Sequence, residues 1–363
     1  MRLLFVLIMF FVLNCARPSE DRDSLDNYAG KGDNGLSTVI ISGGNGAIRS
    51  FSTNSITIWV TAPAISFELD IHSSQAGAWE INFWNDSPLA VLSGTDSSSS
   101  AITINSPTRT KQTRSTYTVT LAAGRNSFQL APADSEIVDT FRFAMFADVQ
   151  RAIDNVGDIF SRINEETSVR FVLFSGDLTS SGSNEELVEF QKKMEVLKIP
   201  LYATPGNHEF GGETETWHNL FGRHNSFFKF KSVYFSLVNS MGATIDPMVY
   251  AWLDSWLAAG KNSSHYFFTH FPPLDPVGFR SGSFRSQKEA AKLLTKLGQG
   301  NLNAAFYGHI HSFYSYSNAG IPSYIVGGGG AIDEKLDGLK RHFAVVETNP
   351  ATQNFNVALV RVD

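Results

Sequence analysis

The stretch Thr204-Pro205-Gly206-Asn207-His208-Glu209 follows directly on a short apolar run and carries an amide, an imidazole and a carboxylate. Four further polar motifs each follow a short apolar run in the same way: Asp148-Val149-Gln150, Gly176-Asp177, Thr269-His270 and Gly308-His309-Ile310-His311. Short apolar runs that alternate with helical patterns are typical of buried strands in an α/β sheet. Because polar residues beyond the carboxyl ends of such strands gather at one edge, we expect the five motifs to form one site.

The motifs contain seven residues of metal-ligating type: Asp148, Gln150, Asp177, Asn207, His270, His309 and His311. This mixed set of carboxylates, amides and imidazoles suits Mn, Fe, Zn, Co or Ni better than Ca or Mg, which prefer oxygen ligands alone. Cys15 is the only cysteine, so a thiol-rich metal site is excluded. One ion cannot use seven ligands, whereas two divalent ions can if Asp177 bridges them.

In this order and spacing the motifs resemble the calcineurin-like metallophosphoesterase family, whose pattern is DxH, GD, GNH[ED], H and GHxH. The resemblance extends from about Phe141 onward. It implies a catalytic domain at residues 141–363 with an α/β fold, a four-layer αββα sandwich. It also implies hydrolysis of a phosphomonoester or phosphodiester bond, with two divalent metal ions (Mn, Fe, Zn or similar) and a hydroxide held between them as the nucleophile.

The resemblance further implies a role for each motif residue. The first metal ion would be held by Asp148, Gln150, Asp177 and His311. The second would be held by Asn207, His270, His309 and the shared Asp177. His208 would be the catalytic group that protonates the leaving alkoxide or stabilises charge in the transition state, and Glu209 is expected to orient it.

Two residues depart from the patterns of this family and its branches. Gln150 stands where the family most often has histidine, and an amide oxygen is a poorer donor to a transition metal than imidazole, so the first metal site is expected to bind more weakly. Purple acid phosphatases carry glycine and a metal-binding tyrosine where this chain has Gln150 and Ser180. We therefore expect a colourless enzyme.

Residues 36–140 read as an all-β sandwich domain that precedes the catalytic domain. Seven short runs are rich in β-branched or aromatic residues: Thr38–Ile41, Ile56–Val60, Ile65–Ile71, Trp79–Trp84, Ala101–Ile104, Tyr117–Leu121 and Phe128–Leu130. Residues 93–100 are expected to form a solvated loop and residues 43–46 a turn. Nothing in this region carries recognisable chemistry, so we interpret it as an accessory domain. Similar sandwiches precede the catalytic domain in relatives such as purple acid phosphatases.

The amino terminus has the pattern of an export signal. Arg2 precedes an apolar run from Leu3 to Leu13, which is too short to span a bilayer and has the size of a signal-peptide core. Residues 1–14 are therefore predicted to be a signal peptide, and Cys15 the lipidated first residue of a bacterial lipoprotein. An ordinary cleaved signal is the alternative, with a periplasmic or secreted product. The polar residues 15–35 are predicted to form a tether.

Composition limits the partners. The net charge of −6 gives no basic field that would attract nucleic acid, so we expect a small phosphorylated substrate and membrane contact only through an anchor at Cys15.

Several other residues have less motif support. We expect His72, His265 and His342 to be structural or surface residues. His218 and His224 are weaker candidates for lining the site. Arg280 and Arg285 could bind a phosphate, but they are more simply interpreted as solvated loop residues.

Two functional alternatives remain from the sequence. Gln150 is compatible with a catalytically degenerate protein, retained as a surface binding or adhesion lipoprotein through its sandwich. A structural envelope lipoprotein is the other alternative, and it leaves His208 unexplained. The metal content of the protein discriminates between an enzyme and these alternatives.

Overall fold

The computed structural model describes residues 23–278, 282–334 and 339–362. The predicted signal peptide and Cys15 lie outside these residues. Within them, no helix is both long and apolar enough to cross a membrane.

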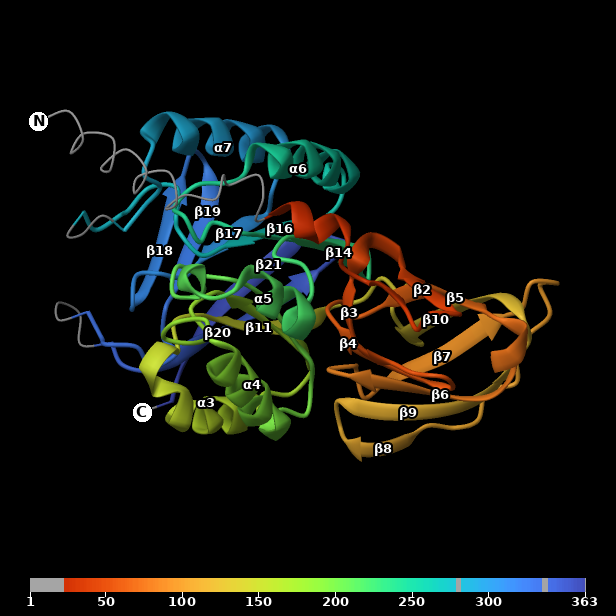
Figure 1. Cartoon of the computed structure of the whole chain (residues 1–363). Coiled ribbons are helices and arrows are strands. Elements are labelled where there is room, and N and C mark those ends of the chain that lie inside the picture. The colour runs from red at the N-terminus through yellow and green to blue at the C-terminus, as the bar shows by residue number, and fades with distance from the viewer. Residues whose placement is uncertain (1–22, 279–281, 335–338, 363) are drawn as a thin grey trace, which may run out of the picture.

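The strands before residue 133 form two five-stranded sheets, drawn in red to orange in Figure 1. The first has the order β1-β2-β5-β10-β7, with bounds Lys31–Asp33, Thr38–Ile41, Ile65–Ile71, Gly124–Pro132 and Ala90–Thr95. The second has the order β3-β4-β6-β9-β8, with bounds Gly46–Phe51, Ser55–Val60, Gly77–Trp84, Arg114–Leu121 and Thr108–Lys111. Their inner faces meet in apolar contacts such as that of Phe67 on β5 with Phe83 on β6, whose ring centroids are 5.8 Å apart in an edge-to-face arrangement.

Two further sheets are built from the strands after residue 140. One has the order β13-β12-β11-β20-β21, with bounds Leu201–Thr204, Val169–Ser175, Phe141–Phe146, His342–Asn349 and Asn354–Arg361. The other has the order β14-β15-β16-β17-β19-β18, with bounds Ser226–Phe230, Val233–Val238, His265–Thr269, Ala304–Tyr307, Ile321–Val326 and Phe313–Asn318. Strands β11, β12 and β13 are parallel, as are β15, β16, β17 and β19.

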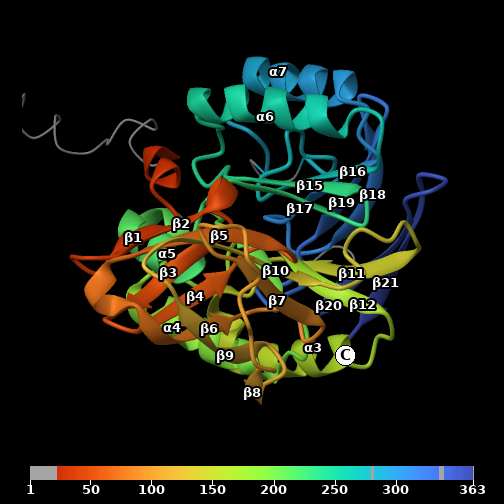
Figure 2. The same ribbon diagram turned by 90° about the vertical axis from the view of Figure 1, so that its right-hand side faces the viewer.

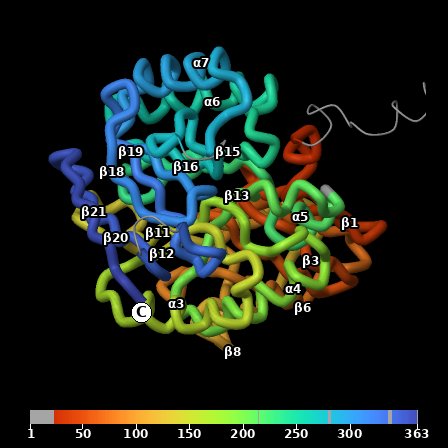
Figure 3. Tube along the Cα trace, turned by 90° about the vertical axis from the view of Figure 1, so that its left-hand side faces the viewer, coloured from red at the N-terminus to blue at the C-terminus, as the bar shows by residue number. Residues whose placement is uncertain are grey.

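Helices cover the outer faces of these two sheets (Figures 1 and 2). The α-helices are α3 (Val156–Ile163), α4 (Asn184–Lys193), α5 (Thr214–Phe221), α6 (Pro247–Gly260) and α7 (Gln287–Gln299). Helices α6 and α7 lie above one sheet and α3 and α4 below the other, which gives the expected four layers αββα. Figure 3 shows the same layers from another side, with β20 and β21 beside β11 and β12.

Short 3-10 helices connect several elements: η1 (Leu25–Asn27), η2 (Ser42–Gly44), η3 (Ser73–Gln75), η4 (Gln150–Asn155), η5 (Met194–Val196) and η6 (Glu209–Gly211).

An aromatic core joins the two sheets of the αββα part. Phe143 of β11 is fully buried, and its ring centroid lies 5.4 Å from that of Phe235 on β15 and 6.1 Å from that of Phe268 on β16. The continuous apolar runs of the sequence are explained by this position, because these strands are covered on both faces.

Helix ends follow their sequence signals. The side chains of Ser183 and Ser286 accept hydrogen bonds from the backbone N–H groups of Glu186 and Glu289, which satisfies donors in the first turns of α4 and α7. Asp246 caps α6 in the same way, with Pro247 as the first helical residue. Helix α7 presents buried Leu293 and Leu297 to the sheet beneath it.

Several local predictions in the sandwich were wrong. The run Ala101–Ile104 forms isolated bridges and no strand, whereas Gly46 begins the strand β3 that the sequence did not predict. Strand β7 occupies the first part of the loop expected at residues 93–100. These segments are short, so their pairing depends on neighbouring strands more than on their own pattern.

The prediction of a solvated tether at residues 15–35 is wrong for its second part, which packs on the rest of the molecule. Asp23 and Asp26 are 1% and 2% exposed, and the strand β1 pairs with β2. The polar composition suggested a solvated segment, but these carboxylates bind groups of the αββα part and so hold the segment on the molecule.

Candidate metal centre

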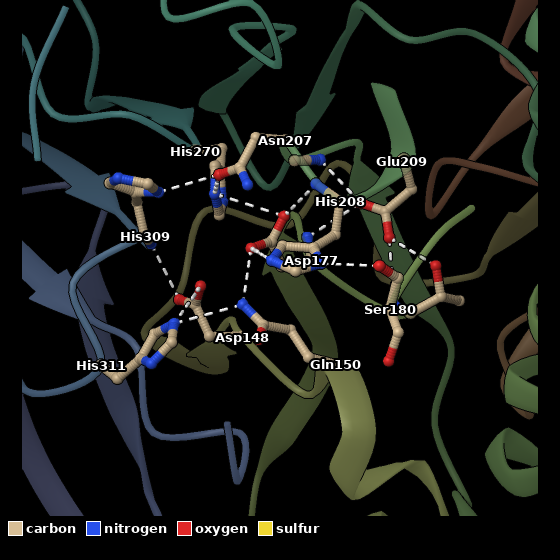
Figure 4. A network of polar contacts seen from close by, with 12 residues as sticks. Asp148, Gln150, Asp177, Ser180, Asn207, His208, Glu209, His270, His309 and His311 are labelled. Carbon is tan, nitrogen blue, oxygen red and sulfur yellow. Dashed lines mark hydrogen bonds and ion pairs between the residues drawn. The ribbon is translucent and has the colours of Figure 1, made fainter. Parts of the chain in front are cut away.

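Each of the five motifs lies just beyond the carboxyl end of a strand, as expected. Strands β11, β12 and β13 of one sheet lead to Asp148, Asp177 and Asn207, and β16 and β17 of the other lead to His270 and His309. Figure 4 shows these side chains converging between the two sheets. The residues come from both sheets, so the sequence prediction of a single sheet edge is refined to two facing edges.

The first half of the cluster contains Asp148, Gln150 and His311. Nε2 of His311 lies 3.6 Å from Oδ1 of Asp148 and 3.2 Å from Nε2 of Gln150. Nε2 of Gln150 also lies 2.9 Å from Oδ2 of Asp177. The four residues predicted for the first metal ion are therefore adjacent.

The second half contains Asn207, His270 and His309. Oδ1 of Asn207 is 2.9 Å from both Nε2 of His270 and Nδ1 of His309. Nε2 of His270 lies 3.4 Å from Oδ1 of Asp177. Oδ2 of Asp177 thus faces the first half of the cluster, and Oδ1 faces the second half. A ligand that bridges two metal ions requires this arrangement.

Backbone carbonyls orient the imidazole rings. Nδ1 of His270 and Nδ1 of His311 each lie 2.7 Å from a carbonyl oxygen, that of Ser175 and that of Ile332. When Nδ1 donates to such a carbonyl, Nε2 is left as the metal-binding atom. Both Nε2 atoms face the cluster, so the rings are held in the tautomer that a metal ion needs.

Burial and charge act in opposite directions on the central pair. Burial alone raises the pKa of the Asp177 carboxyl, but the charge and hydrogen bond of His270 and the backbone N–H of His208 hold that pKa well below its ordinary value. For His270, burial lowers the pKa, and the carboxylates of Asp177 and Asp148 raise it to about 9. Asp177 is therefore a carboxylate, the form that binds metal ions.

Four of the seven candidate ligands have left-handed backbone conformations. The φ angles are +67° for Asp148, +48° for Gln150, +61° for Asp177 and +69° for His309. Such conformations are uncommon outside glycine and cluster at functional sites, where the surrounding structure holds them in place. The sequence carries no signal for this strain.

The glycines beside the ligands act in two ways. Gly176 has φ of +87°, a conformation that glycine adopts without strain. Gly206 and Gly308 do not have positive φ. They are needed for close approach, because a Cβ on Gly206 would lie 2.3 Å from Oδ1 of Asp177, and one on Gly308 would lie 2.9 Å from Oδ2 of Asp148.

Glu209 does not orient His208, contrary to the prediction. Its buried carboxylate accepts hydrogen bonds from the backbone N–H groups of Gly206, Asp177 and Thr179, at 2.8, 2.9 and 3.0 Å. Nδ1 of His208 lies 2.7 Å from the carbonyl oxygen of Ser180 instead. Glu209 therefore joins the loops after β12 and β13, and Ser180, which the sequence singled out only as a missing tyrosine, orients His208.

The residues present fit divalent transition metals. The seven side chains form a nitrogen and oxygen donor set without sulfur, and Asp148, Asp177 and His270 offer ligand atoms within 4.8 Å of one another. Gln150 presents Nε2 to the cluster, and half a turn of its amide presents Oε1, the atom that coordinates metals. Gly327 has no side chain, and a Cβ at this position would lie 2.9 Å from Oδ2 of Asp148. The glycine therefore leaves room for the Asp148 carboxylate.

The less supported candidates lie elsewhere. His218 and His224 contact Asp26 and Asp23 outside this centre. His265 and His342 are buried in the sheets and His72 is exposed on the sandwich. Arg280 is outside the described residues.

Phe271 was not predicted to matter. Its ring centroid lies 3.9 Å from that of His309, so the residue that follows His270 packs one imidazole in place. Its position directly after a candidate ligand was the only sequence signal.

Comparisons with known proteins identify the family of the αββα part. Residues 141–313 match the family described as calcineurin-like phosphoesterase. Over 62 residues the chain is 36% identical to a probable glycerophosphodiester phosphodiesterase, GpdQ, of Arcobacter nitrofigilis, in an alignment that covers 17% of this chain and 22% of that protein. The chain thus matches less than a quarter of the length of this curated relative.

A solved structure shows the fold. The purple acid phosphatase PPD1 from seeds of yellow lupin (Lupinus luteus) superposes with a TM-score of 0.53 at 12% identity, over 83% of this chain and 70% of that chain. A structure of PhoD superposes with a TM-score of 0.48 at 10% identity, over 83% of this chain and 87% of that chain. With the five motifs at the ends of the expected strands, residues 141–313 of this chain belong to the calcineurin-like phosphoesterase family.

Proposed function

We propose that this protein hydrolyses phosphomonoester or phosphodiester bonds with two divalent metal ions. The observation that carries the proposal is the Asp177 carboxylate, whose Oδ2 faces Gln150 at 2.9 Å and whose Oδ1 faces His270 at 3.4 Å. Asp148, Gln150, Asp177 and His311 would hold one ion. Asn207, His270, His309 and Asp177 would hold the other. When bound, such a pair of ions supplies a nucleophile at neutral pH and offsets the charge that develops on the phosphoryl group.

Part of the centre is accessible to solvent. Asp148, Asp177 and His270 are at most 1% exposed, whereas Gln150, Asn207, His208, His309 and His311 are half-buried. A small phosphorylated substrate would meet the centre at these half-buried residues.

His208 is placed to act on the leaving group. Its side chain is 34% exposed, and its Nε2 lies 3.9 Å from Oδ2 of Asp177, at the edge of the centre. Because Nδ1 faces the carbonyl of Ser180, the protonated ring has an Nε2–H that it can donate to the leaving oxygen. Ser180 thus fixes the direction of proton donation.

The test is hydrolysis of p-nitrophenyl phosphate and bis-p-nitrophenyl phosphate by the purified chain, first freed of metal and then supplied with Mn²⁺ or Zn²⁺. We expect metal-dependent turnover. His208→Ala should lower kcat roughly 10²–10⁴-fold without loss of bound metal, and Asp177→Asn should lose metal as well as turnover. His72→Ala, on the exposed surface of the sandwich, is the matched control and should retain both.

The preference between the two substrates would separate a monoesterase from a diesterase. Absence of turnover with every metal, together with fewer than two bound ions per chain, would contradict the proposal. That outcome would favour the surface-binding alternative and point to Gln150 as the defect.

We also propose that the protein is exported and anchored through a lipid on Cys15. The support is the sequence of residues 1–15, with an apolar run that ends just before the cysteine. Metabolic labelling with a palmitate analogue should label the wild-type chain and not Cys15→Ser. Equal labelling of the two chains, or none in either, would contradict the lipid anchor.

A further inference from the structure

A second cluster of histidines and carboxylates lies where the start of the described chain meets helix α5. Asp23 and Asp26 come from the segment around η1, His218 from α5, and His224 from the segment between α5 and β14. Oδ1 of Asp26 is 2.8 Å from Nε2 of His218, and Oδ1 of Asp23 is 3.2 Å from Nδ1 of His224. The two imidazole centroids are 4.3 Å apart.

The cluster buries more negative than positive charge. Asp23 and Asp26 are 1% and 2% exposed. Among the described residues, the one lysine or arginine nitrogen within 4.0 Å of either carboxylate is Nε of Arg223, 3.8 Å from Oδ2 of Asp26. Buried carboxylates need compensation by cations or metal ions, and one guanidinium compensates one of the two.

The Asp23 carboxylate is satisfied on one oxygen only. Its Oδ1 accepts hydrogen bonds from the side-chain amides of Asn225 and Asn239, at 3.0 and 2.9 Å. Its Oδ2 is buried and has no hydrogen-bond partner among the described residues. A buried acceptor without a partner costs free energy, and a cation against the His224 ring would remove that cost.

We propose that Asp23, Asp26, His218 and His224 form a third metal site, which binds a divalent transition metal of the zinc class. Two oxygen and two nitrogen ligands make the closed four-coordinate set of a structural site. The ligand atoms of Asp26, His218 and His224 lie within 4.8 Å of one another, and Oδ1 of Asp23 lies 3.2 Å from Nδ1 of His224. Small shifts of these side chains would bring the four within about 2.0–2.2 Å of one ion.

The surroundings of the site are built for ligand orientation. The side-chain amide of Asn225 donates to Asp26 Oδ2 at 2.9 Å as well as to Asp23, and the backbone N–H of Asn239 donates to Asn225 Oδ1 at 2.8 Å. Hydrogen bonds of this kind fix ligating carboxylates in metal sites. The metal ion would connect the amino-terminal segment to α5, the helix that follows the His208 motif along the chain.

The test uses Zn²⁺ and Co²⁺ as probes and the full chain. Zinc per chain, measured by elemental analysis after dialysis, should be about one ion lower in His218→Gln and in Asp23→Asn than in wild type. The exposed His72→Gln is the control and should retain all of its zinc. Because the site lies outside the catalytic centre, His218→Gln should keep its turnover with the nitrophenyl substrates.

A second measurement does not depend on how well the His218 variant folds. The Asp177→Asn chain, weakened at the catalytic centre, should bind Co²⁺ with the intense visible absorption of a four-coordinate ion, and chelation of that ion should lower Tm. Unchanged zinc in His218→Gln and Asp23→Asn, or an absence of four-coordinate Co²⁺ absorption in Asp177→Asn, would overturn the proposal. Its failure would leave the catalytic proposal intact, which stands or falls on turnover.

Discussion

The candidate metal centre depends on residues held in strained conformations. Asp148, Gln150, Asp177 and His309 all have positive φ, a cost of roughly 1–3 kcal/mol for each residue that the surrounding contacts must offset. Part of the compensation is visible at Asp148, whose Oδ2 accepts the backbone N–H of His309 at 2.9 Å. The strained ligands thus support one another, and the loss of one is expected to loosen the others.

Gln150 is the residue at which a substitution should strengthen the centre. Gln150→His replaces an amide by imidazole, a better donor to transition metals, and histidine enters the left-handed region more readily than most residues. We expect the variant to retain more Mn²⁺ than wild type when both are dialysed against the same chelator. Equal retention would show that position 150 is not a ligand.

Glu209 should contribute to stability through the loops it joins. In Glu209→Gln only one side-chain oxygen remains to accept hydrogen bonds from the backbone N–H groups of Asp177, Thr179 and Gly206. The NH₂ group that replaces the other oxygen is itself a donor and cannot accept them. We expect a loss of about 1–3 kcal/mol in the free energy of unfolding, together with weaker metal retention. Urea unfolding measures the first, and the exposed Glu213→Gln is the control. A variant as stable as that control would refute this role.

At the scale of the elements, much could be predicted because strand and helix signals were strong. Strands β2 and β5 have the bounds predicted from the sequence, Thr38–Ile41 and Ile65–Ile71. The candidate ligands also lie together as predicted, since each follows a buried strand. The role of Glu209 and the strained φ angles could not be predicted, because both depend on contacts between loops that are distant in sequence, such as that of Glu209 with Thr179.

His265 makes strand β16 sensitive to pH. Its side chain is fully buried, with Nε2 bonded to Ser236 Oγ at 2.8 Å and Nδ1 without a partner among the described residues. Burial lowers its pKa from 6.5 to about 4. As pH falls from 6.5 toward 4, the unfolded chain therefore takes up a proton that the folded chain does not, and stability is lost.

The contribution can be isolated with His265→Gln. Wild type should lose about 2 kcal/mol more unfolding free energy than the variant between pH 7.5 and pH 5. Urea unfolding at the two pH values measures the difference. Identical pH dependence in the two chains would mean that His265 is protonated in the folded state and that its burial has no such effect.

At the scale of the whole molecule, the sandwich and the αββα part share contacts at the edge strand β13. Asn85 of the sandwich donates to the carbonyl of Leu201 at 2.7 Å and to that of Val60 at 2.8 Å, and accepts the N–H of Leu201 at 2.9 Å. The Trp59 and Phe221 rings pack nearby, with centroids 5.7 Å apart. Sequence reasoning treated the sandwich as a separate unit, because no pattern in either part marks these contacts.

Replacement of Asn85 should destabilise the whole chain. Asn85→Gly removes the three hydrogen bonds, and glycine adopts the φ of +62° at this position without strain. We expect this variant to lose about 2–4 kcal/mol of the free energy of unfolding. Asn85→Ala should cost about 1 kcal/mol more, because alanine is strained at that φ. Thermal unfolding compares them with the exposed Asn105→Ala. If both Asn85 variants melt like Asn105→Ala, these bonds do not hold the two parts together.

The central claim is that Asp177 joins two metal ions in one centre. Electron paramagnetic resonance of the Mn²⁺-loaded chain tests it most directly, because ions about 3.5–4 Å apart interact magnetically. We predict the spectrum of a spin-coupled Mn²⁺ pair in wild type and its loss in Asp177→Asn. A spectrum of isolated Mn²⁺ ions alone, in a wild-type chain loaded with at least two ions, would contradict the claim.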